Sequence, residues 1–324
     1  MGWDIILLLV GLALVVKGAD YLVEGASAIA RKLGLSEFVI GLTIVGMGTS
    51  APEMVVSLIG ALQGKGAIAV GNVVGSNIFN TLLILGVTAL ILPMDITREN
   101  RRRDIPFNLL FTLLLIGLGL NGTLFGLGND GLMRWDGAIL LTLFVLYMVM
   151  CFRKGRQEQG NEPQEENAAE EKSVSPWFST LRVLGGLAAL VFGGRFFVNS
   201  AVSLATRLGM SEKLVAITIL AGGTSLPELA TCVAAAVKKK GQLALGNIIG
   251  SNVFNILLIL GGSALLNPLS FNQITVVDMG ALLLSAIALV TCLWIGRKNQ
   301  LDRLDGSLFL LVWAAYMTYL ILQR

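Results

Sequence analysis

The sequence has no histidine and only three cysteines, and both scarcities limit the chemistry open to it. Without histidine the chain cannot build a His-liganded zinc or haem site or relay protons through imidazole. Cys151, Cys232 and Cys292 are scattered within apolar stretches. They are therefore predicted to act as small hydrophobic residues rather than as disulfides or metal ligands, and we expect no cofactor.

Charge is scarce as well, because only 14% of the 324 residues are charged, whereas 55% are hydrophobic and the mean hydropathy is +0.77. This composition is typical of a helical integral membrane protein, with the lipid bilayer as its main partner. The net charge is only +3 and no basic face indicates nucleic acid, nor is an obligatory protein partner evident. The N-terminal run lacks a basic region and a cleavage site, so it is predicted to be a first span rather than a removed signal peptide.

Ten apolar runs are long enough to cross a hydrocarbon core of about 30 Å. They lie at approximately 5–29, 37–62, 67–92, 105–125, 132–152, 178–206, 212–237, 242–267, 274–296 and 303–322. A polar linker at 153–177 divides them into two sets of five, so we expect one unit at 1–152 and another at 178–324. The predicted fold class is an all-α membrane protein with ten transmembrane helices.

One short motif, Gly48-Thr49-Ser50-Ala51-Pro52-Glu53, returns as Gly223-Thr224-Ser225-Leu226-Pro227-Glu228 at an offset of 175. Proline removes a backbone donor and clashes with the preceding turn, so helices 2 and 7 are predicted to be broken here. A glutamate at the centre of a membrane helix costs about 2.5–3.5 kcal/mol. Two such glutamates at matching places indicate a functional site.

The repeat extends beyond this motif. Leu33–Glu37 matches Leu208–Glu212, and Gly71–Asn80 matches Gly246–Asn255, at the same offset. A repeat with an odd number of spans enters the membrane from the opposite side the second time. The two halves are therefore predicted to be inverted repeats, as in many transporters.

The basic residues predict the orientation. If both termini lie on one side, the loops on the other side hold 16 lysines and arginines, against 5 on the terminal side. Such an excess marks cytoplasmic loops. We expect a multi-pass protein of the plasma membrane (the cell inner membrane) with both termini extracytoplasmic and linker 153–177 cytoplasmic. This linker is rich in glutamate, which fits a solvated tether better than a calcium-sensing loop, since the alternating acidic pattern of such a loop is missing.

Helical spacing groups the polar residues of each half. Thr49 and Glu53 are four apart, as are Thr224 and Glu228, so each pair shares a helix face. The next span carries a polar stripe beside a Gly-x-x-x-Gly face that permits close helix approach. This stripe consists of Asn72, Ser76 and Asn80 in the first half and of Asn247, Ser251 and Asn255 in the second.

Hydroxyls, amide oxygens, carboxylates and freed carbonyls are hard donors of the kind that Ca²⁺ takes, and Na⁺ is similar in size and hardness. Two glutamates balance one divalent ion or several monovalent ones. The alternative is that these groups are structural, because Ser and Asn in membrane helices more often join helices than bind ions. We assign that role to the stripe's Asn72 and Asn247 and to Asn77 and Asn252, and expect ligation from Ser76, Asn80, Ser251 and Asn255. Lys17, Asp20 and Glu24 fit an ion-pair network, and Asp20 can pair with Arg195.

The paired motifs resemble the alpha repeats of the sodium/calcium exchanger family. By that resemblance, Glu53, Glu228, Thr49 and Thr224 would form a calcium site. A sodium site nearer the cytoplasm would use Ser50, Ser76, Glu53 and the carbonyl of Gly46. A sodium site nearer the outside would use Ser225, Ser251, Glu228 and the carbonyl of Ala221, while Asn80 and Asn255 would border the middle.

The resemblance implies a Na⁺/Ca²⁺ antiporter, and not an enzyme, that exports Ca²⁺ by alternating access and is electrogenic. Asparagine at both 80 and 255 argues against potassium co-transport, because the potassium-dependent branch carries aspartate where Asn255 stands. A H⁺/Ca²⁺ antiporter on the same scaffold is the nearest alternative.

Two other classes of protein are less compatible with the sequence. An intramembrane enzyme with Glu53 and Glu228 as an acid/base pair would need a nucleophile or metal that differs between the halves, whereas the motifs are repeated. A passive channel would conduct Ca²⁺ without sodium.

Overall fold

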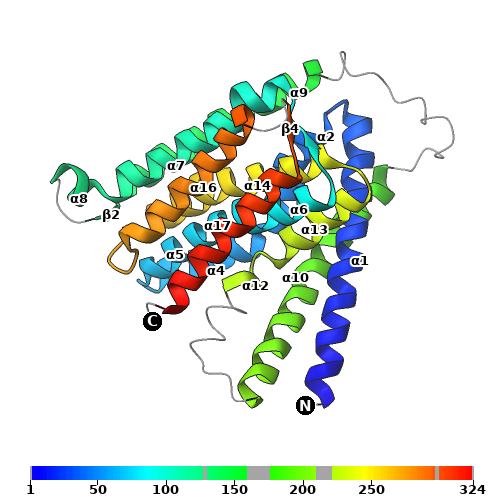
Figure 1. Cartoon of the computed structure of the whole chain (residues 1–324), viewed down its shortest axis with the longest axis horizontal. Helices are drawn as coiled ribbons and strands as arrows, with labels where there is room; N and C mark the ends of the chain where they lie inside the picture. Colours follow the sequence, from blue (N-terminus) through cyan, green and yellow to red (C-terminus); the bar gives the residue numbers. More distant parts are fainter. Residues whose placement is uncertain (1, 127–129, 159–175, 209–220, 296–298, 323–324) are drawn as a thin grey trace.

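The computed structural model is almost entirely helical (Figure 1) and describes residues 2–126, 130–158, 176–208, 221–295 and 299–322. Most of the predicted linker and residues 209–220, which include part of the predicted seventh span, lie outside these residues. α-Helices are labelled α, π-helical segments η and strands β.

The first half contains α1 (Gly2–Leu33), α2 (Glu37–Ile40), η1 (Gly41–Val45), α3 (Gly46–Thr49), α4 (Ala51–Leu62), α5 (Gly66–Ile78), η2 (Phe79–Ile84), α6 (Leu85–Ile91), β1 (Met94–Asp95), η3 (Asn100–Asp104), α7 (Ile105–Gly119), α8 (Asn121–Phe125), β2 (Gly131–Leu132) and α9 (Arg134–Glu158). The second half contains α10 (Pro176–Arg207), α12 (Ala221–Gly223), α13 (Leu226–Val237), α14 (Gly241–Phe254), η6 (Asn255–Leu260), α15 (Gly261–Leu266), β3 (Leu269–Ser270), α16 (Val276–Ile295), β4 (Gln300–Leu301) and α17 (Arg303–Leu322).

Six helical stretches of the described chain are long and apolar enough to cross a membrane, which makes the protein a multi-pass membrane protein. They are Gly2–Leu33, Gly66–Ile91, Arg134–Arg153, Trp177–Arg207, Gly241–Leu266 and Arg303–Leu322. A seventh candidate is the bent pair Glu37–Thr49 and Ala51–Leu62. The other three predicted ranges also contain helices, namely α7, α13 and α16. It stays a prediction that all ten ranges cross the membrane.

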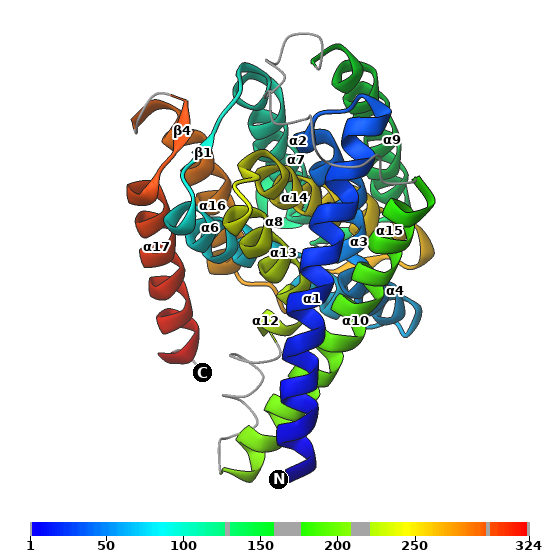
Figure 2. The same ribbon diagram turned by 90° about the vertical axis from the view of Figure 1, so that its right-hand side faces the viewer.

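Helices α1 and α10 form a long antiparallel pair that extends beyond the remaining bundle (Figure 2). The backbones touch at glycines, because Gly11 lies against Gly193 and Gly18 lies against Gly186. A Cβ added to Gly18 would come within 2.8 Å of the Gly186 carbonyl oxygen. By the offset of 175, Gly186 is the repeat equivalent of Gly11, and Gly193 is that of Gly18. The contact of Gly11 with Gly193 is therefore equivalent to the contact of Gly18 with Gly186. The opening helices of the two halves therefore run in opposite directions.

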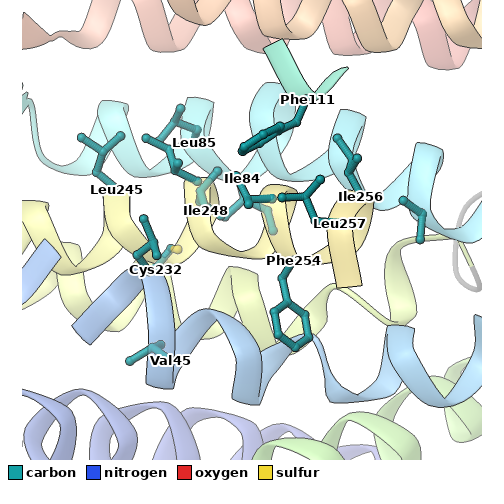
Figure 3. Close-up of a cluster of buried hydrophobic side chains, with 14 of the residues drawn as sticks. Val45, Ile84, Leu85, Phe111, Cys232, Leu245, Ile248, Phe254, Ile256 and Leu257 are labelled. Atoms are coloured by element: carbon teal, nitrogen blue, oxygen red, sulfur yellow. The ribbon is translucent and has the colours of Figure 1, made fainter. Parts of the chain in front are cut away.

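Helix α14 lies at the centre of the core. Every residue from Leu243 to Phe254 is buried, and Figure 3 shows apolar side chains of α14 and η6 between those of η2, α6 and η1. Gly250 lets the backbone of α14 approach η1 closely, since an added Cβ would lie 2.2 Å from the Leu42 carbonyl oxygen. The small-residue face predicted from sequence therefore contacts the broken helix of the other half. For Gly71 and Gly75 the equivalent partners, Lys213 and Ile217, lie outside the described residues.

Two short strand pairs link loops that are distant in sequence. β1 pairs with β4 through Met94 and Leu301, and β2 pairs with β3 through Leu132 and Leu269. Each pair joins two loops that the charge pattern assigns to the same side of the membrane. The strands hold the ends of the bundle together and position the loops around them.

Candidate ion-binding site

The predicted helix break is present in the second span. α3 ends at Thr49 and α4 begins at Ala51, with a bend of 50° and Pro52 in the first turn of the new helix. Proline is suited to this position because the first turn needs no amide donor. Ser225 precedes α13 with φ −88° and ψ 9°, almost the φ −80° and ψ 9° of Ser50. The two motifs therefore fold in the same way locally.

Each break places a glutamate in the first turn of the following helix. Glu53 and Glu228 are 1% and 0% exposed, and neither forms an ion pair with a described residue. The positive end of the helix dipole favours a carboxylate at this position. The two carboxylates lie near each other, because each accepts a hydrogen bond from the serine three residues before the other glutamate. Two neighbouring buried negative charges need a cation or a proton to balance them.

The two halves bind each other's glutamate. The Ser50 hydroxyl donates to Glu228 Oε1 at 2.9 Å, and the Ser225 hydroxyl donates to Glu53 Oε1 at 3.0 Å. The threonines behave alike, since Thr49 interacts with the Glu228 carboxylate and Thr224 with that of Glu53. Each carboxylate is thus held by the motif of the other half.

The Gly46 carbonyl lies beside this pair, and it also accepts a hydrogen bond from the Ser50 amide at 3.1 Å. The Gly46 carbonyl oxygen is 3.4 Å from the hydroxyls of both Thr49 and Ser251. The Thr49 hydroxyl is also 3.3 Å from Asn247 Oδ1. Oxygens of α3 in the first half and of α14 in the second half therefore meet at one place.

A set of amides from both halves lies next to these groups. Asn80 donates to Asn252 Oδ1 at 3.2 Å, Asn255 donates to Asn77 Oδ1 at 2.9 Å, and Asn252 donates to Thr81 Oγ1 at 2.8 Å. Asn80 lies in η2 and Asn255 begins η6. π-Helical segments often occur at functional sites because the widened turn re-aims side chains.

Of the buried side-chain oxygens that lack a hydrogen-bond partner among the described residues, four belong to this site: Glu53 Oε2, Glu228 Oε2, Asn80 Oδ1 and Asn255 Oδ1. They come from equivalent positions of the two repeats. An unpaired buried oxygen carries a free-energy penalty of about 1–3 kcal/mol. This penalty is relieved when the oxygens coordinate a cation, and oxygen is the donor that Ca²⁺ and Na⁺ prefer.

In the described part of the chain, no three His, Cys, Asp or Glu side chains lie close enough together to hold a metal ion. A cation bound here would depend on two carboxylates and on neutral hydroxyl, amide and carbonyl oxygens. The nearby thiol of Cys232 accepts a hydrogen bond from Asn247 at 3.3 Å. The cysteine is buried between α13 and α14, as expected of a small hydrophobic residue.

The hydrogen bonds run between the two halves, whereas the grouping of these residues around bound ions, as the resemblance implies it, stays a prediction. Ser50 contacts Glu228 rather than Glu53, and Ser251 contacts the Gly46 carbonyl. The reason is that α14 crosses the broken helix of the opposite half, so each cluster mixes oxygens of both repeats. Ser76 is buried on α5, and Ala221 begins α12 next to residues outside the described range.

Sequence reasoning assigned Asn72, Asn77, Asn247 and Asn252 to helix joining, and their contacts have that character. Asn72, for example, donates to the Glu53 carbonyl at 3.1 Å and to Ser57 at 3.0 Å. The motifs indicated neither the contact of Asn247 with Thr49 nor the π-helical form of η2 and η6. Repetition of the motif was the only available signal, and it does not tell which half a side chain faces.

Comparisons with known proteins agree with this geometry. The chain matches the family described as "Sodium/calcium exchanger protein" over residues 3–153 and 178–322. It is 40% identical to the putative antiporter CaxA of Alkalimonas amylolytica, covering 96% of both chains. It is 33% identical to the sodium/calcium exchanger MaX1 of Methanosarcina acetivorans, covering 98% of both chains.

Among solved structures, the sodium-calcium exchanger NCX_Mj superposes with a TM-score of 0.81 at 31% identity, over 98% of both chains. The family match covers both halves of the chain and leaves out mainly the linker between them. The chain therefore belongs to the sodium/calcium exchanger protein family, whose members are ion transporters rather than enzymes.

Proposed function

We propose that the protein is a Na⁺/Ca²⁺ antiporter that exports Ca²⁺ in exchange for Na⁺. The observation that carries the proposal is the reciprocal contact between the motifs, in which Ser50 holds Glu228 and Ser225 holds Glu53. It creates one buried site with two negative charges. One Ca²⁺ satisfies both charges, and so do Na⁺ ions distributed over the same oxygens, so the two kinds of ion compete.

The twelve predicted residues supply the ligands in this proposal: Glu53, Glu228, Thr49, Thr224, Ser50, Ser225, Ser76, Ser251, Asn80, Asn255, Gly46 and Ala221. The four unpaired oxygens support direct roles for the two glutamates, Asn80 and Asn255. Gly46 and Ala221 take part through their backbone carbonyls. The ions are cargo, and the proposal requires no cofactor.

Alternating access follows from the arrangement of the two halves. Residues 1–152 and 178–324 form inverted repeats in this proposal, and the antiparallel packing of α1 on α10 supports the inversion. The site lies between the repeats, where movement of the α1–α10 pair past the bundle opens it to one side and then the other. Both termini face outward and linker 153–177 faces the cytoplasm.

Exchange of three Na⁺ for one Ca²⁺ moves one net charge per cycle. A membrane potential of 100 mV then contributes about 2.3 kcal/mol to each cycle. The direction of transport is set by the inward sodium gradient together with this potential. Potassium is not carried, because no third carboxylate stands at position 80 or 255.

A flux assay tests the proposal. Proteoliposomes loaded with Na⁺ and diluted into Na⁺-free medium should accumulate radiocalcium, and an ionophore that collapses the sodium gradient should stop the uptake. Glu53→Gln and Glu228→Gln should each abolish it, because either change leaves one charge for a divalent ion. Glu37→Gln is the matched control: Glu37 forms a partly buried ion pair with Lys240 at 3.3 Å, outside the ion site, so this variant should transport normally.

Further arms of this assay decide the coupling ion. A H⁺/Ca²⁺ antiporter is the second candidate, because buried carboxylates with unpaired oxygens can also take up protons. Uptake driven by a pH gradient without Na⁺ would favour that candidate. Added K⁺ should leave the rate unchanged, and a valinomycin-imposed potential should alter it if transport is electrogenic.

A further inference from the structure

A basic hollow lies away from the ion site, between residues 96–103 and the loop before α17. It consists of two adjoining cavities of about 260 and 560 Å³ that share Arg98 and Arg102 in their walls. Glu99 and Arg103 complete the smaller cavity, and Arg101 and Asn299 line the larger one. None of these residues belongs to the ion site.

The loop that carries the arginines is held firmly. Thr97 and Asn100 cap each other through hydrogen bonds of 2.7–3.1 Å. The Ile96 amide donates to the Asn299 carbonyl at 2.7 Å, which continues the pairing of β1 with β4. Arg101 donates to the Asn299 side chain. The wall of the hollow is therefore built from two loops joined by backbone and side-chain hydrogen bonds.

The hollow has an excess of positive charge. Arg103 is paired with Asp104 at 2.7 Å, and Glu99 is the one carboxylate in the lining. Arg98 and Arg102 are exposed, and within the described chain neither forms an ion pair. Two free guanidinium groups that line the same cavities match the geometry of a phosphate, to which each can donate two parallel hydrogen bonds.

The position in the fold indicates where that phosphate comes from. α6 ends at Ile91, and its last turns expose the apolar side chains of Leu90 and Ile91. The hollow begins five residues after that helix end and therefore lies at the level of the lipid head groups. The charge pattern predicts that the loop with these arginines faces the cytoplasm. On that side of a membrane, basic pockets between transmembrane helices bind anionic head groups.

We propose that this hollow binds the phosphate head group of an anionic phospholipid, with Arg98 and Arg102 as the principal ligands and the acyl chains beside the end of α6. Glu99 weakens the site by placing one negative charge in its lining. The inference is independent of the transported ions, because binding of the lipid requires no residue of the ion site.

Native mass spectrometry of the full chain, purified with phosphatidylglycerol and phosphatidylcholine in equal amounts, tests this site. The wild type should retain phosphatidylglycerol. The double variant Arg98→Gln/Arg102→Gln should retain about thirtyfold less, because each basic residue at an anionic surface contributes roughly a factor of five. The control Lys32→Gln/Arg153→Gln removes two exposed basic residues from the same predicted side and should bind like the wild type.

A second variant protects the test against misfolding of the double variant. Glu99→Gln should increase phosphatidylglycerol retention, an outcome that a damaged fold cannot produce. Equal loss in the control pair and the Arg98/Arg102 pair would overturn the proposal, since retention would then reflect overall surface charge. Displacement of the lipid by millimolar inorganic phosphate, with phosphate itself stabilising only the wild type against heat, would overturn it in favour of a free-phosphate site.

Discussion

The hydroxyls of Ser50 and Ser225 determine how the two glutamates are oriented. Each serine lies at the helix break of its own half and donates to the carboxylate of the other half, at 2.9 and 3.0 Å. A hydrogen bond to a charged group stabilises by about 1.5–3 kcal/mol. The exchange of donors fixes one oxygen of each glutamate and leaves the other free for an ion.

We predict that Ser50→Ala and Ser225→Ala each weaken the apparent affinity for the transported ions by roughly 10–100-fold, which corresponds to that hydrogen-bond energy. Concentration dependence of radiocalcium uptake and of its inhibition by Na⁺ measures the change. Ser285→Ala is the control, because the hydroxyl of this buried serine bonds within α16, to the Leu282 carbonyl at 2.7 Å, and contacts no residue of the site. Unchanged affinities in both serine variants would mean that the reciprocal contact does not organise the site.

At the scale of elements, glycine decides how closely α14 approaches the broken helix of the first half. Gly246 and Gly250 lie against the carbonyls of Phe38 and Leu42, and an added Cβ would come within 2.2 Å of either oxygen. Backbone atoms cannot move aside as a flexible side chain can. The ion site depends on this approach, because α14 carries Ser251 and Asn247 to the helix break.

Gly250→Ala is therefore expected to destabilise the protein by at least about 1–3 kcal/mol, the usual penalty of overpacking. Gly280→Ala on α16 should be neutral or slightly stabilising, since no described atom lies within 4 Å of the added methyl group and alanine favours helix. Thermal unfolding of both variants in the same detergent compares them. Similar melting temperatures for the two variants would contradict the close contact.

A second feature at this scale ties α1 to the end of α13. Lys238 Nζ lies 3.1 Å from Asp20 Oδ1 and 3.0 Å from Glu24 Oε1, and Arg182 of α10 lies 3.5 Å from Glu24. Burial lowers the pKa of Lys238, but hydrogen bonds to Glu24 and Asp20 outweigh it and raise the pKa above its ordinary value. The lysine therefore stays charged at physiological pH, and on the alkaline side the contact persists until the pH exceeds the usual lysine range. Asp20 and Glu24 are therefore paired, but with Lys238 and Arg182. Among the described residues, the predicted partners Lys17 and Arg195 form no ion pair with them.

The equivalent of Lys238 in the first half is the uncharged Gln63, so the repeat does not preserve this ion-pair contact. We predict that Lys238→Gln increases amide hydrogen exchange in the last turns of α1, because the helix end loses its connection to α13. Lys239→Gln is the control, since the neighbouring Lys239 is exposed and has no ion pair with any described residue. Equal exchange in both variants would show that the ion pairs do not restrain α1.

For the whole molecule, the loops joined by strand pairing are those that the charge pattern assigns to one side. β1 and β4 lie in two basic loops, whereas β2 and β3 lie in two loops on the side of the termini. Arg207 and Asp4, which are predicted to lie outside, approach to 3.8 Å. These contacts are compatible with the predicted orientation and leave its direction to be measured.

Cysteine labelling in intact cells measures that direction. Gln63→Cys should react with a membrane-impermeant maleimide, whereas Lys239→Cys, one residue past its repeat equivalent, should react only after permeabilisation. Background labelling should be low, because Cys151, Cys232 and Cys292 are all buried. Labelling of both positions from the same side would contradict inverted repeats.

The sequence by itself determined much of this protein. Hydrophobic runs predicted the helices, and proline with the flanking glycines predicted the break at Ser50, because both depend on local backbone chemistry. The duplicated motif identified Glu53 and Glu228, since a carboxylate in an apolar span is rare enough to be informative.

Only the tertiary structure decided which oxygens meet. The offset of 175 makes Ser50 and Ser225 equivalent, but equivalence alone does not tell whether a serine contacts its own glutamate or the other one. That outcome depends on the crossing of α14 over η1 and α3, which contacts between distant segments determine. The partners of Asn80 and Asn255 in the π-helical turns likewise depend on packing between the halves, because both asparagines bond to the opposite repeat.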